Sequence, residues 1–316
     1  MTALSLDDDA PWSLADILAR RSLVALVPFA HTGDLLTAPD GVAVAALDHD
    51  VVVELTAENR ALLSAWTTRA DRVFLFDEAR PSLRRLLRAG VDVARPVCRA
   101  TLERLAGGGA DDTGNVPRDA LAARERAKHI VHRLEQQLER VDERGAKKIA
   151  RLENLVLRAF AALEDRGLAV DVAGWRALVD ESAHKAAAAK GALFAAAGPL
   201  IPRDLFGTPE INLDADADVR ALLERAANGK LDDLGRATIE RIDHPTATPI
   251  ARALLEYREH NKIVSTYGDA FLSHVDKRDG RIHAMFIPLG ASTGRVASRD
   301  PNLQNLPSDA RFHACL

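Results

Sequence analysis

The sequence predicts an α/β layer followed by a mainly helical region. Its first hundred residues alternate short apolar runs with helical patterns, which is typical of a mixed sheet with helices against it. From residue 119 onwards the periodicity is mostly helical, with one face charged and the other apolar. A chain of 316 residues is long for one domain and is expected to form two, each with its own core.

The predicted α/β layer opens with a helix. Ser13-Leu14-Ala15-Asp16 has the pattern of a capping box, and the helix is expected to run to Arg20. Further helices are expected at Thr56–Asp71 and at Pro81–Gly90, which begins with proline and ends on glycine. Short runs rich in apolar residues predict strands at Leu23–Phe29, Gly41–Leu47, Val51–Leu55 and Val73–Phe76.

The predicted helical region follows a flexible loop, GGGADDTGN, at Gly107–Asn115. The domain break is expected near Glu143-Arg144-Gly145. Helices are expected at 119–141, 147–166, 173–198 (capped by Asp171), 218–227 and 248–275. The clearest apolar stripe, on the helix at 147–166, consists of Leu152, Leu155, Val156, Ala159, Phe160 and Leu163. A strand is expected at Arg281–Gly290, and the final RFHACL also has a strand-like pattern.

Composition limits the possible classes of protein. The net charge of -4 means that any nucleic-acid surface must be a local patch on an acidic background. Cys98 and Cys315 are far apart, and His313 near Cys315 completes no metal-ligand pattern, so no disulfide framework or zinc site is expected. The acidic N-terminus lacks a signal-peptide pattern, and no apolar run approaches the roughly 20 residues of a membrane helix. These features predict a cytoplasmic protein with no membrane partner.

Two cations on the helix at 248–275 are the first candidate site. Arg258 and Lys262 are four residues apart and therefore project from one face, one turn apart. Paired cations on a helix can hold backbone phosphates in register. The alternative is a solvated helix face on which Glu259 partly neutralises the two charges, and these residues alone favour that alternative.

The stretch ASTGRVASRDPNLQNLP, Ala291–Pro307, is the second candidate site. Thr293-Gly294 and Asp300-Pro301 are turn signals that expose what lies between them. The side chains of Arg295, Asn302, Gln304 and Asn305 carry many hydrogen-bond donors, which would be costly to bury unless each were paired.

These residues carry a resemblance. The pattern T-G-R-x-x-S-x-x-P-N-L-Q-N, with Ser298 at its centre, resembles the signature of family A DNA polymerases, the bacterial DNA polymerase I group. Upstream, Leu255–Tyr267 resembles that family's thumb-to-palm helix and Gly280–Phe286 its strand leading into the motif. Arg151–Asp171 resembles the first thumb helix, and Glu210–Leu213 a turn of the F-N-x-x-S type. The resemblance extends in order over residues 145–316.

The resemblance implies three parts. Residues 1–144 would form a degenerate 3′–5′ exonuclease-like domain of the ribonuclease H-like α/β class, residues 145–279 a helical thumb, and residues 280–316 the beginning of the polymerase palm. The implied partner is primer–template DNA. This fold class would place the α/β layer first, the mainly α-helical thumb second and the first palm strands last.

The resemblance also implies DNA-binding roles for seven residues. Arg258 and Lys262 would hold duplex phosphates, while Arg295, Gln304 and Asn305 would lie along the minor groove near the primer terminus. Every Watson–Crick pair presents a purine N3 or pyrimidine O2 acceptor there, so donors can check pair geometry without reading sequence. Thr293 and Asn302 complete the implied set. Where family members tend to carry a His-Gln pair and a Thr, this chain has Ile287, Pro288 and Ala291, which puts the contacts of that strand in doubt.

Polymerase chemistry needs carboxylates that the 316 residues do not supply. Phosphoryl transfer uses two metal ions held by carboxylates. In this family those lie in D-Y-S-x-I-E-like and H-D-E-like motifs, and neither motif is present. We therefore expect no catalytic residue, no metal and no nucleotide incorporation by this chain alone. Mg²⁺ is expected only for a complete polymerase.

The exonuclease positions also lack acids. A D-x-E would fall near Val27-Pro28-Phe29, an Asp is replaced by Ser82, and a Y-x-x-x-D falls on Ala122 and Arg126. An arginine in a divalent-metal site is strongly unfavourable. The first domain is therefore expected to be an inactive exonuclease fold kept as a scaffold.

Two readings remain open at this point: a family A polymerase portion, and a stand-alone duplex-binding protein or subunit whose palm and fingers half is encoded separately. An unrelated α/β-plus-helical protein would need the T-G-R…P-N-L-Q-N match to be chance, and that reading is discounted. A chain that breaks off inside a strand-like pattern favours truncation and would leave an exposed strand edge. DNA binding is expected to be weak and strongly salt-dependent.

Overall fold

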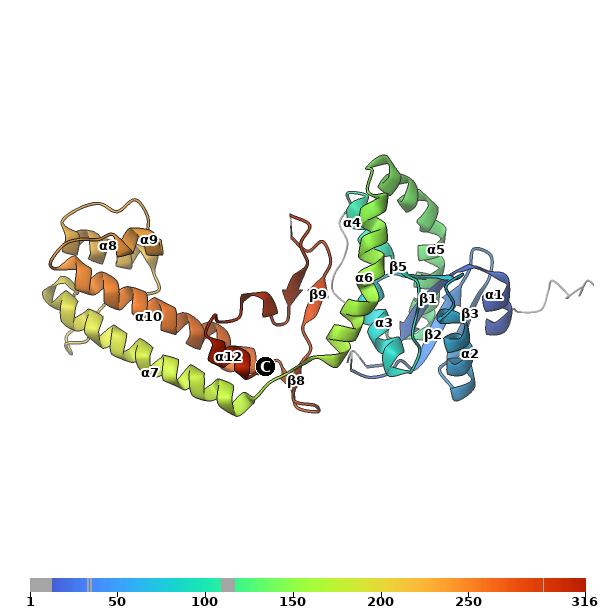
Figure 1. Ribbon diagram of the computed structural model, residues 1–316, viewed down its shortest axis with the longest axis horizontal. Coiled ribbons are helices and arrows are strands. Elements are labelled where there is room, and N and C mark those ends of the chain that lie inside the picture. The colour runs from blue at the N-terminus through green and yellow to red at the C-terminus, as the bar shows by residue number, and fades with distance from the viewer. Residues whose placement is uncertain (1–12, 33, 35, 109–116, 292) are drawn as a thin grey trace, which may run out of the picture. The chain divides into compact units, whose positions relative to one another are not determined.

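A computed structural model describes residues 13–32, 34, 36–108, 117–291 and 293–316 (Figure 1). Packing divides the chain into two compact units. The first, the sheet unit, comprises residues 1–167 and 283–304, and the second, the helical unit, comprises residues 168–282 and 305–316. The N-terminal stretch read for a signal peptide and most of the predicted loop at 107–115 lie outside the described residues.

The sheet unit contains a five-stranded mixed sheet with the order β3-β2-β1-β4-β5. The first three strands pair antiparallel, whereas β1, β4 and β5 pair parallel. The register is set by pairs such as Ala25 with Ala45 and Leu23 with Val73. The strands are β1 (Leu23–Phe29), β2 (Gly41–Ala45), β3 (Asp50–Glu54), β4 (Val73–Phe76) and β5 (Pro96–Cys98).

Helices cover both faces of this sheet, which confirms the predicted α/β layer. Side chains alternate along β1, so Val24 and Leu26 enter one core and Ala25 and Val27 enter the other. The first core is completed by α1 (Leu14–Arg20), α2 (Ala57–Thr67), α3 (Ala79–Arg88) and α6 (Lys147–Arg166), and the second by α4 (Arg99–Leu105) and α5 (Ala120–Glu143). A strand buried on both faces explains why β1 reads as a continuous apolar run.

Local sequence signals predicted the start of α1 correctly and the start of α3 to within two residues. The capping box of α1 is present, with the Ser13 hydroxyl accepting from the Asp16 amide and the Asp16 carboxylate accepting from the Ser13 amide. Helix α3 begins at Ala79, two residues before the predicted Pro81. Proline fits there because amide groups of the first helical turn have no partner within the helix.

The apolar stripe predicted on α6 does not face the core. Leu152 and Leu155 are 59% and 68% exposed, whereas the opposite face buries Leu157 and Ala161 against the sheet layer. Because α6 packs on the sheet layer, packing divides the chain at Gly167 and not near Glu143-Arg144-Gly145. The three-part division at 144 and 279, which follows from the resemblance, stays a prediction.

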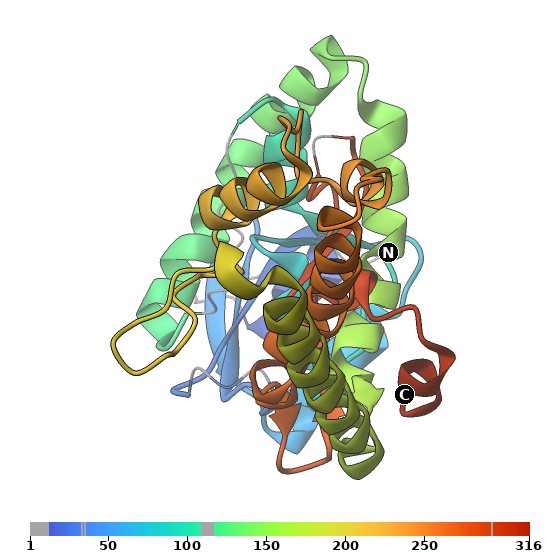
Figure 2. The same cartoon turned by 90° about the vertical axis from the view of Figure 1, so that its left-hand side faces the viewer.

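The helical unit is built on two long antiparallel helices, α7 (Val172–Ala197) and α10 (Ala247–Tyr267), which lie side by side (Figures 1 and 2). At one end they share an apolar core with α8 (Asp216–Ala227) and α9 (Arg236–Glu240). The Asp171 carboxylate caps α7 by accepting from the Gly174 amide at 3.0 Å, as predicted. Smaller elements are η1 (Gly198–Leu200), α11 (Asp269–Leu272) and a three-stranded sheet with the order β6-β8-β7, formed by Leu168–Ala169, Arg281–Ile282 and Val275–Asp276.

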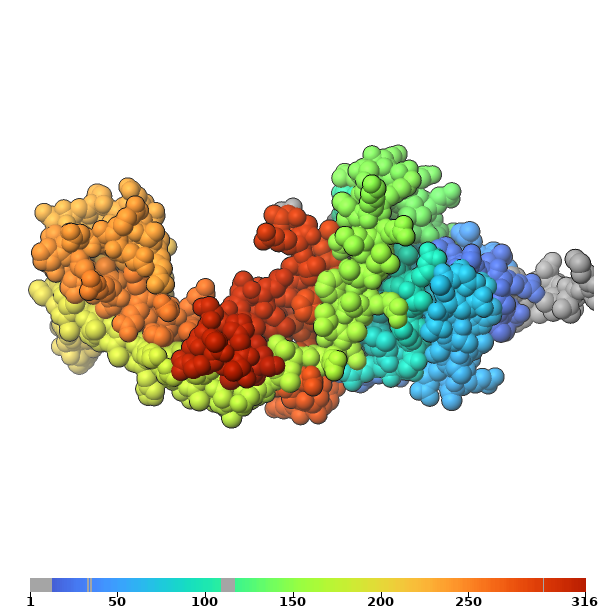
Figure 3. All heavy atoms as spheres, viewed as in Figure 1, coloured from blue at the N-terminus to red at the C-terminus, as the bar shows by residue number. Residues whose placement is uncertain are grey.

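At the other end of the hairpin, α12 (Ala310–Ala314) packs against α7 (Figure 3). The fully buried ring of Trp175 stacks on Phe271 at 4.7 Å and meets Phe312 edge-on at 4.8 Å. Its Nε1 donates to the Tyr267 carbonyl at 2.8 Å. The last residues of the chain are therefore part of the folded core of this unit.

Three sequence predictions are wrong in this region. The helix expected to run to Val275 ends at Tyr267, because Gly268 turns the backbone so tightly that a Cβ there would lie 2.4 Å from the Val264 carbonyl oxygen. The strand expected at Arg281–Gly290 divides into β8 and β9 (Met285–Ile287), which belong to different sheets. The segment RFHACL contributes Arg311–Ala314 to α12 and forms no strand.

The described helices include none with the length and apolar character that crossing a membrane requires.

Candidate nucleic-acid interface

A groove of about 820 Å³ lies in the helical unit between α7, α10 and the segment 305–311. It contains three of the seven predicted DNA-binding residues, Arg258, Lys262 and Asn305. Its lining also includes Lys185 of α7, Arg236 at the start of α9 and Arg311 of α12. Residues far apart in the sequence thus build one surface, and no local spacing pattern predicted the last three cations.

The groove carries an excess of positive charge. Its lining has five lysine or arginine side chains, Lys185, Arg236, Arg258, Lys262 and Arg311, against two acidic ones, Glu259 and Asp309. Because the chain has a net charge of -4, a nucleic-acid surface was expected only as a local basic patch, and the groove is such a patch.

Most of these cations have acidic neighbours. Arg311 lies 2.8 Å from both Glu181 and Asp309, and the second oxygen of Glu181 lies 2.6 Å from Lys185. Hydrogen bonds from Arg311 and then from Lys185 lower the pKa of Glu181 to about 2. Hydrogen bonding to Arg311 also lowers the pKa of Asp309, and bonds to both carboxylates raise the pKa of Arg311. These acids partly neutralise the cations of the groove.

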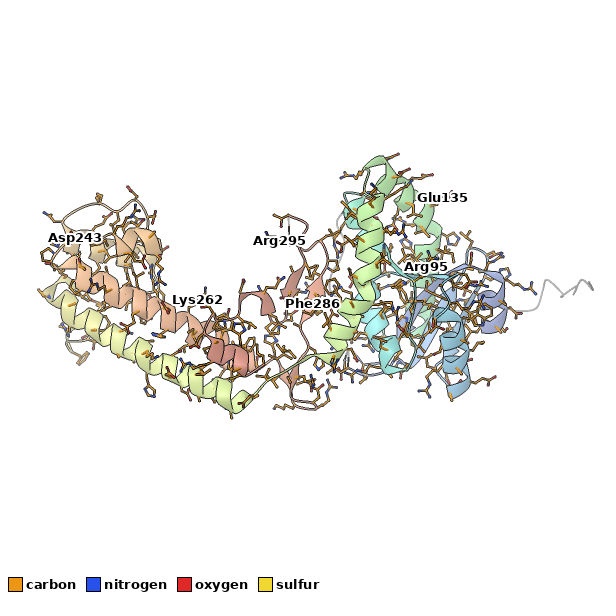
Figure 4. All side chains as sticks on the ribbon, viewed as in Figure 1. Arg95, Glu135, Asp243, Lys262, Phe286 and Arg295 are labelled. Atoms are coloured by element: carbon orange, nitrogen blue, oxygen red, sulfur yellow. The ribbon has the colours of Figure 1, made fainter. Side chains whose placement is uncertain are left out.

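The two predicted phosphate ligands differ in their surroundings. The Arg258 guanidinium is half-buried and donates to the Leu234 carbonyl at 3.2 Å and to the Asp216 carboxylate at 3.4 Å. Lys262, one turn further along α10, is exposed, and its ammonium group has no hydrogen-bond or ion-pair partner among the described residues (Figure 4). Asp216 is 85% exposed, so water weakens its hold on Arg258.

Tyr267 fixes the backbone at the edge of the groove. Its hydroxyl donates to the Asn305 carbonyl oxygen, and its own carbonyl accepts from Trp175. Burial raises the pKa of the Tyr267 hydroxyl, which stays a donor at neutral pH. The backbone of Asn305 is therefore anchored, while its side chain is exposed and makes no hydrogen bond within the described part of the chain.

The remaining four predicted residues, Thr293, Arg295, Asn302 and Gln304, belong to the sheet unit. Here β9 pairs antiparallel with β10 (Ala297–Arg299), and Arg295 lies in the loop that joins them (Figure 4). The Ala291 amide donates to the Arg295 carbonyl at 3.2 Å, and Gly294 has a φ of +78°, which glycine adopts without strain. The side chains of Thr293 and Arg295 are exposed.

The amides of the motif fold back onto their own backbone. Gln304 accepts from the Ser298 amide at 3.1 Å and donates to the Val296 carbonyl at 2.8 Å. Asn302 accepts from the Ser298 hydroxyl at 3.2 Å and from the Gln304 amide at 2.9 Å. Ser298, only 6% exposed, also accepts from the Leu303 amide. This network holds β10 against η2 (Leu303–Asn305). The side-chain amides of Asn302 and Gln304, which were predicted to contact DNA, therefore also stabilise the turn.

The residues at the implied exonuclease positions do not fit divalent metal ions. Val27 and Phe29 are buried apolar side chains of β1, and Ser82 is buried in α3. Arg126 lies 3.4 Å from Asp77, which Arg99 also contacts, so cations occupy the neighbourhood of that carboxylate. The described residues contain no cluster of three or more His, Cys, Asp or Glu side chains able to hold a metal ion.

Comparisons with known proteins agree with the motif. Residues 204–314 match the sequence profile of DNA polymerase family A. The thermostable DNA polymerase I of Thermus aquaticus is 33% identical over 156 residues, which is 49% of this chain and 18% of that protein. DNA polymerase I of Synechocystis is 34% identical over 170 residues, 51% of this chain and 16% of that protein. The match spans less than a fifth of the length of these relatives.

The fold has a solved counterpart. The POL domain of Pol1 from M. smegmatis, solved in complex with DNA primer-template and dNTP, aligns with a TM-score of 0.72 and 23% sequence identity. The alignment covers 97% of this chain and 57% of that chain. The likeness extends over both units, although the profile match covers residues 204–314.

Proposed function

We propose that this chain, which belongs to DNA polymerase family A, binds primer–template duplex DNA through the groove of the helical unit and the T-G-R loop of the sheet unit. The observation that carries the proposal is the convergence of Arg258, Lys262 and Asn305 on one groove with an excess of cations. The solved counterpart of the fold holds a DNA primer-template, which makes duplex DNA the first ligand to test.

In this proposal Lys262 and Arg258 bind backbone phosphates. Lys262 is exposed, and no acidic residue in the described part of the chain pairs with it, so it provides the first contact. Arg258 exchanges the exposed Asp216 for a backbone phosphate, which carries one full negative charge and has charged neighbours along the strand. Such contacts release counterions, and this makes the affinity fall steeply with salt.

The minor-groove role is proposed for Arg295, Gln304 and Asn305. Arg295 and Asn305 have exposed side chains, and Gln304 keeps one amide hydrogen beyond the one it donates to Val296. Donors aimed at purine N3 and pyrimidine O2 accept every Watson–Crick pair alike. Thr293 and Asn302 support these three, because Asn302 shapes the turn and Thr293 borders the loop.

The groove is tested with a Lys262→Ala variant in a fluorescence-anisotropy titration against primer–template DNA over a salt series. We expect weaker binding and a salt slope reduced by about one, since one phosphate contact is lost. Lys277→Ala, which removes an exposed lysine of the same unit outside the groove, is the matched control and should leave the slope unchanged. Equal slopes for the two variants would refute the groove assignment.

We further propose that residues 1–316 neither polymerise nor degrade DNA by themselves. The two-metal carboxylates of polymerisation are absent from the sequence, and Val27, Ser82 and Arg126 stand where exonuclease acids would be needed. The sheet order β3-β2-β1-β4-β5 supports the ribonuclease H-like assignment of this scaffold. Metal-dependent shortening of a 3′-labelled primer by the purified chain, or its extension with nucleotides, would overturn this part.

A cytoplasmic location belongs to the same proposal, because duplex DNA of the genome is the ligand. The hypotheses of a stand-alone duplex-binding protein and of a separately encoded catalytic half stay predictions.

A further inference from the structure

A buried glutamate in the sheet unit contacts three residues from other parts of the chain, two through its carboxylate and one through its backbone carbonyl. Glu164, near the end of α6, has a side chain only 3% exposed. Its Oε1 accepts from the Arg80 guanidinium of α3 at 2.6 Å and from the Phe286 backbone amide of β9 at 2.7 Å. Its carbonyl oxygen lies 2.8 Å from Nδ1 of His283. One residue thus joins α3, α6 and the strand that leads into the T-G-R loop.

Neighbouring contacts hold the same strand to the same helices. The ring of Phe286 stacks on Phe160 of α6, with centroids 5.8 Å apart and planes inclined by 22°. Two residues further on, the Pro288 carbonyl accepts from Arg104 of α4 at 3.4 Å. Strand β9 is therefore supported by the helices on its outer side, and Glu164 supplies the hydrogen bond to its backbone.

The strand pairing carries this support to the motif. Phe286 is the register partner of Ser298, and the amides of both residues bond to acceptors outside the β9–β10 ladder. The Phe286 amide bonds to Glu164 on one side of the hairpin, and the Ser298 amide bonds to Gln304 on the other. At the Phe286–Ser298 pair, both strands of the hairpin that carries Arg295 are thus held by hydrogen bonds to groups outside the hairpin ladder.

Stability alone does not explain a buried charge at this place. Replacing a buried ion pair by apolar residues of similar volume is often neutral or stabilising, because desolvation opposes the attraction. A carboxylate paired with a guanidinium is, however, a stronger acceptor for a backbone amide than a neutral group, and the Arg80 guanidinium lies 2.6 Å from the same Oε1. The arrangement is therefore better suited to fixing a backbone position than to adding stability.

We propose that Glu164 is a positioning residue that fixes the β9–β10 hairpin, and with it the T-G-R loop, to the helices of the sheet unit. Arg80 serves it by balancing the charge. The sheet unit thereby holds the loop in place, whether or not it has nuclease activity. The DNA readout of this role rests on the proposed function, whereas its structural readout does not.

Two double variants separate positioning from stability. Arg80→Met with Glu164→Leu removes both charges and the acceptor for the Phe286 amide. Arg80→Met with Glu164→Gln removes both charges but keeps a side-chain oxygen as acceptor. Amide hydrogen exchange is measured at Phe286 and, as a report of global opening, at Leu26 in the core of the sheet.

We expect the ratio of Phe286 to Leu26 exchange rates to be roughly five- to tenfold higher in the Leu variant than in the Gln variant, as loss of one hydrogen bond predicts. Equal ratios would overturn the inference. So would a Leu variant that fails to fold while the Gln variant folds, because the side chain would then serve the whole fold. Primer–template affinity should fall only in the Leu variant; a wild-type chain that binds no DNA would refute the proposed function and leave the exchange ratio to decide this inference.

Discussion

Arg311 of α12 is paired with Glu181 of α7, with Nη1 2.8 Å from Oε2, although the two residues are 130 positions apart in the chain. The pair lies at the groove proposed to receive DNA, and Lys185 shares the same carboxylate. Glu181 neutralises two cations of the groove, Lys185 and Arg311. It is therefore expected to affect both the pH dependence of this unit's stability and the affinity of the groove for phosphate.

The Glu181 carboxyl is expected to titrate far below its ordinary range. Its pKa in the folded chain is about 2, against an ordinary value of 4.5. A lowered folded-state pKa means that the stabilisation is complete above about pH 4.5 and is lost as the pH falls toward 2. Carboxyl NMR titration should show Arg311→Ala moving this pKa upward, with Lys185 still holding it below 4.5. An unchanged midpoint in that variant would contradict the pairing.

Neutralising Glu181 should tighten DNA binding. Glu181→Gln releases Lys185 from its ion pair and leaves Arg311 with Asp309 alone, so both cations are more available to phosphate. We expect affinity for primer–template to rise roughly two- to fivefold at low salt and the gain to shrink as salt screens it. Glu256→Gln makes the same charge change on α10 outside the groove, and an equal gain there would show that only net charge matters.

Arg295 is expected to act alike on all base pairs. Arg295→Ala should weaken primer–template binding by a similar factor for primers ending in A·T and in G·C pairs, since both present minor-groove acceptors. Parallel binding titrations with two primers measure this. Arg278→Ala, which removes an exposed arginine paired with Asp276, is the control. A loss confined to one type of terminal pair would argue for sequence readout.

Trp175 should be the costliest single truncation in the helical unit. Trp175→Ala removes a fully buried ring and leaves the Tyr267 carbonyl without its donor, so we expect a loss of about 3–5 kcal/mol in the free energy of unfolding. Trp175→Phe keeps most of the ring and should cost less. Urea denaturation followed by circular dichroism measures both. A smaller loss for Trp175→Ala than for Phe194→Ala, at a half-buried site of α7, would contradict the prediction.

Short-range signals predicted much of the sheet unit. The capping residues of α1 and α7 act on amides within three residues, so their patterns are legible in sequence. β1 and β4 have the predicted bounds, and β2 and β3 lie within a residue or two of theirs. The Arg258–Lys262 spacing correctly indicated a shared face, because four residues make about one helical turn.

Long-range packing decided the rest. Apolar periodicity on α6 showed that the helix has two faces but not which one meets the sheet, and the exposed Leu155 shows the wrong choice. RFHACL is too short for its pattern to separate helix from strand. Asp309 accepts from the Arg311 amide, and Phe312 packs on Trp175, so capping and tertiary contact together make it helical.

The motif from Thr293 to Asn305, together with the helix pattern before it, indicated the family and led to the proposed class of ligand, because those residues are contiguous and their order survives in the sequence. The groove came only from the fold. Apolar packing brings α7, α9 and α12 next to α10, and this places Lys185, Arg236 and Arg311 in the same groove as Lys262. The spacing of charged residues along the sequence does not predict this arrangement. Gln304 likewise looked like a free donor until folding gave it Ser298 and Val296 as partners.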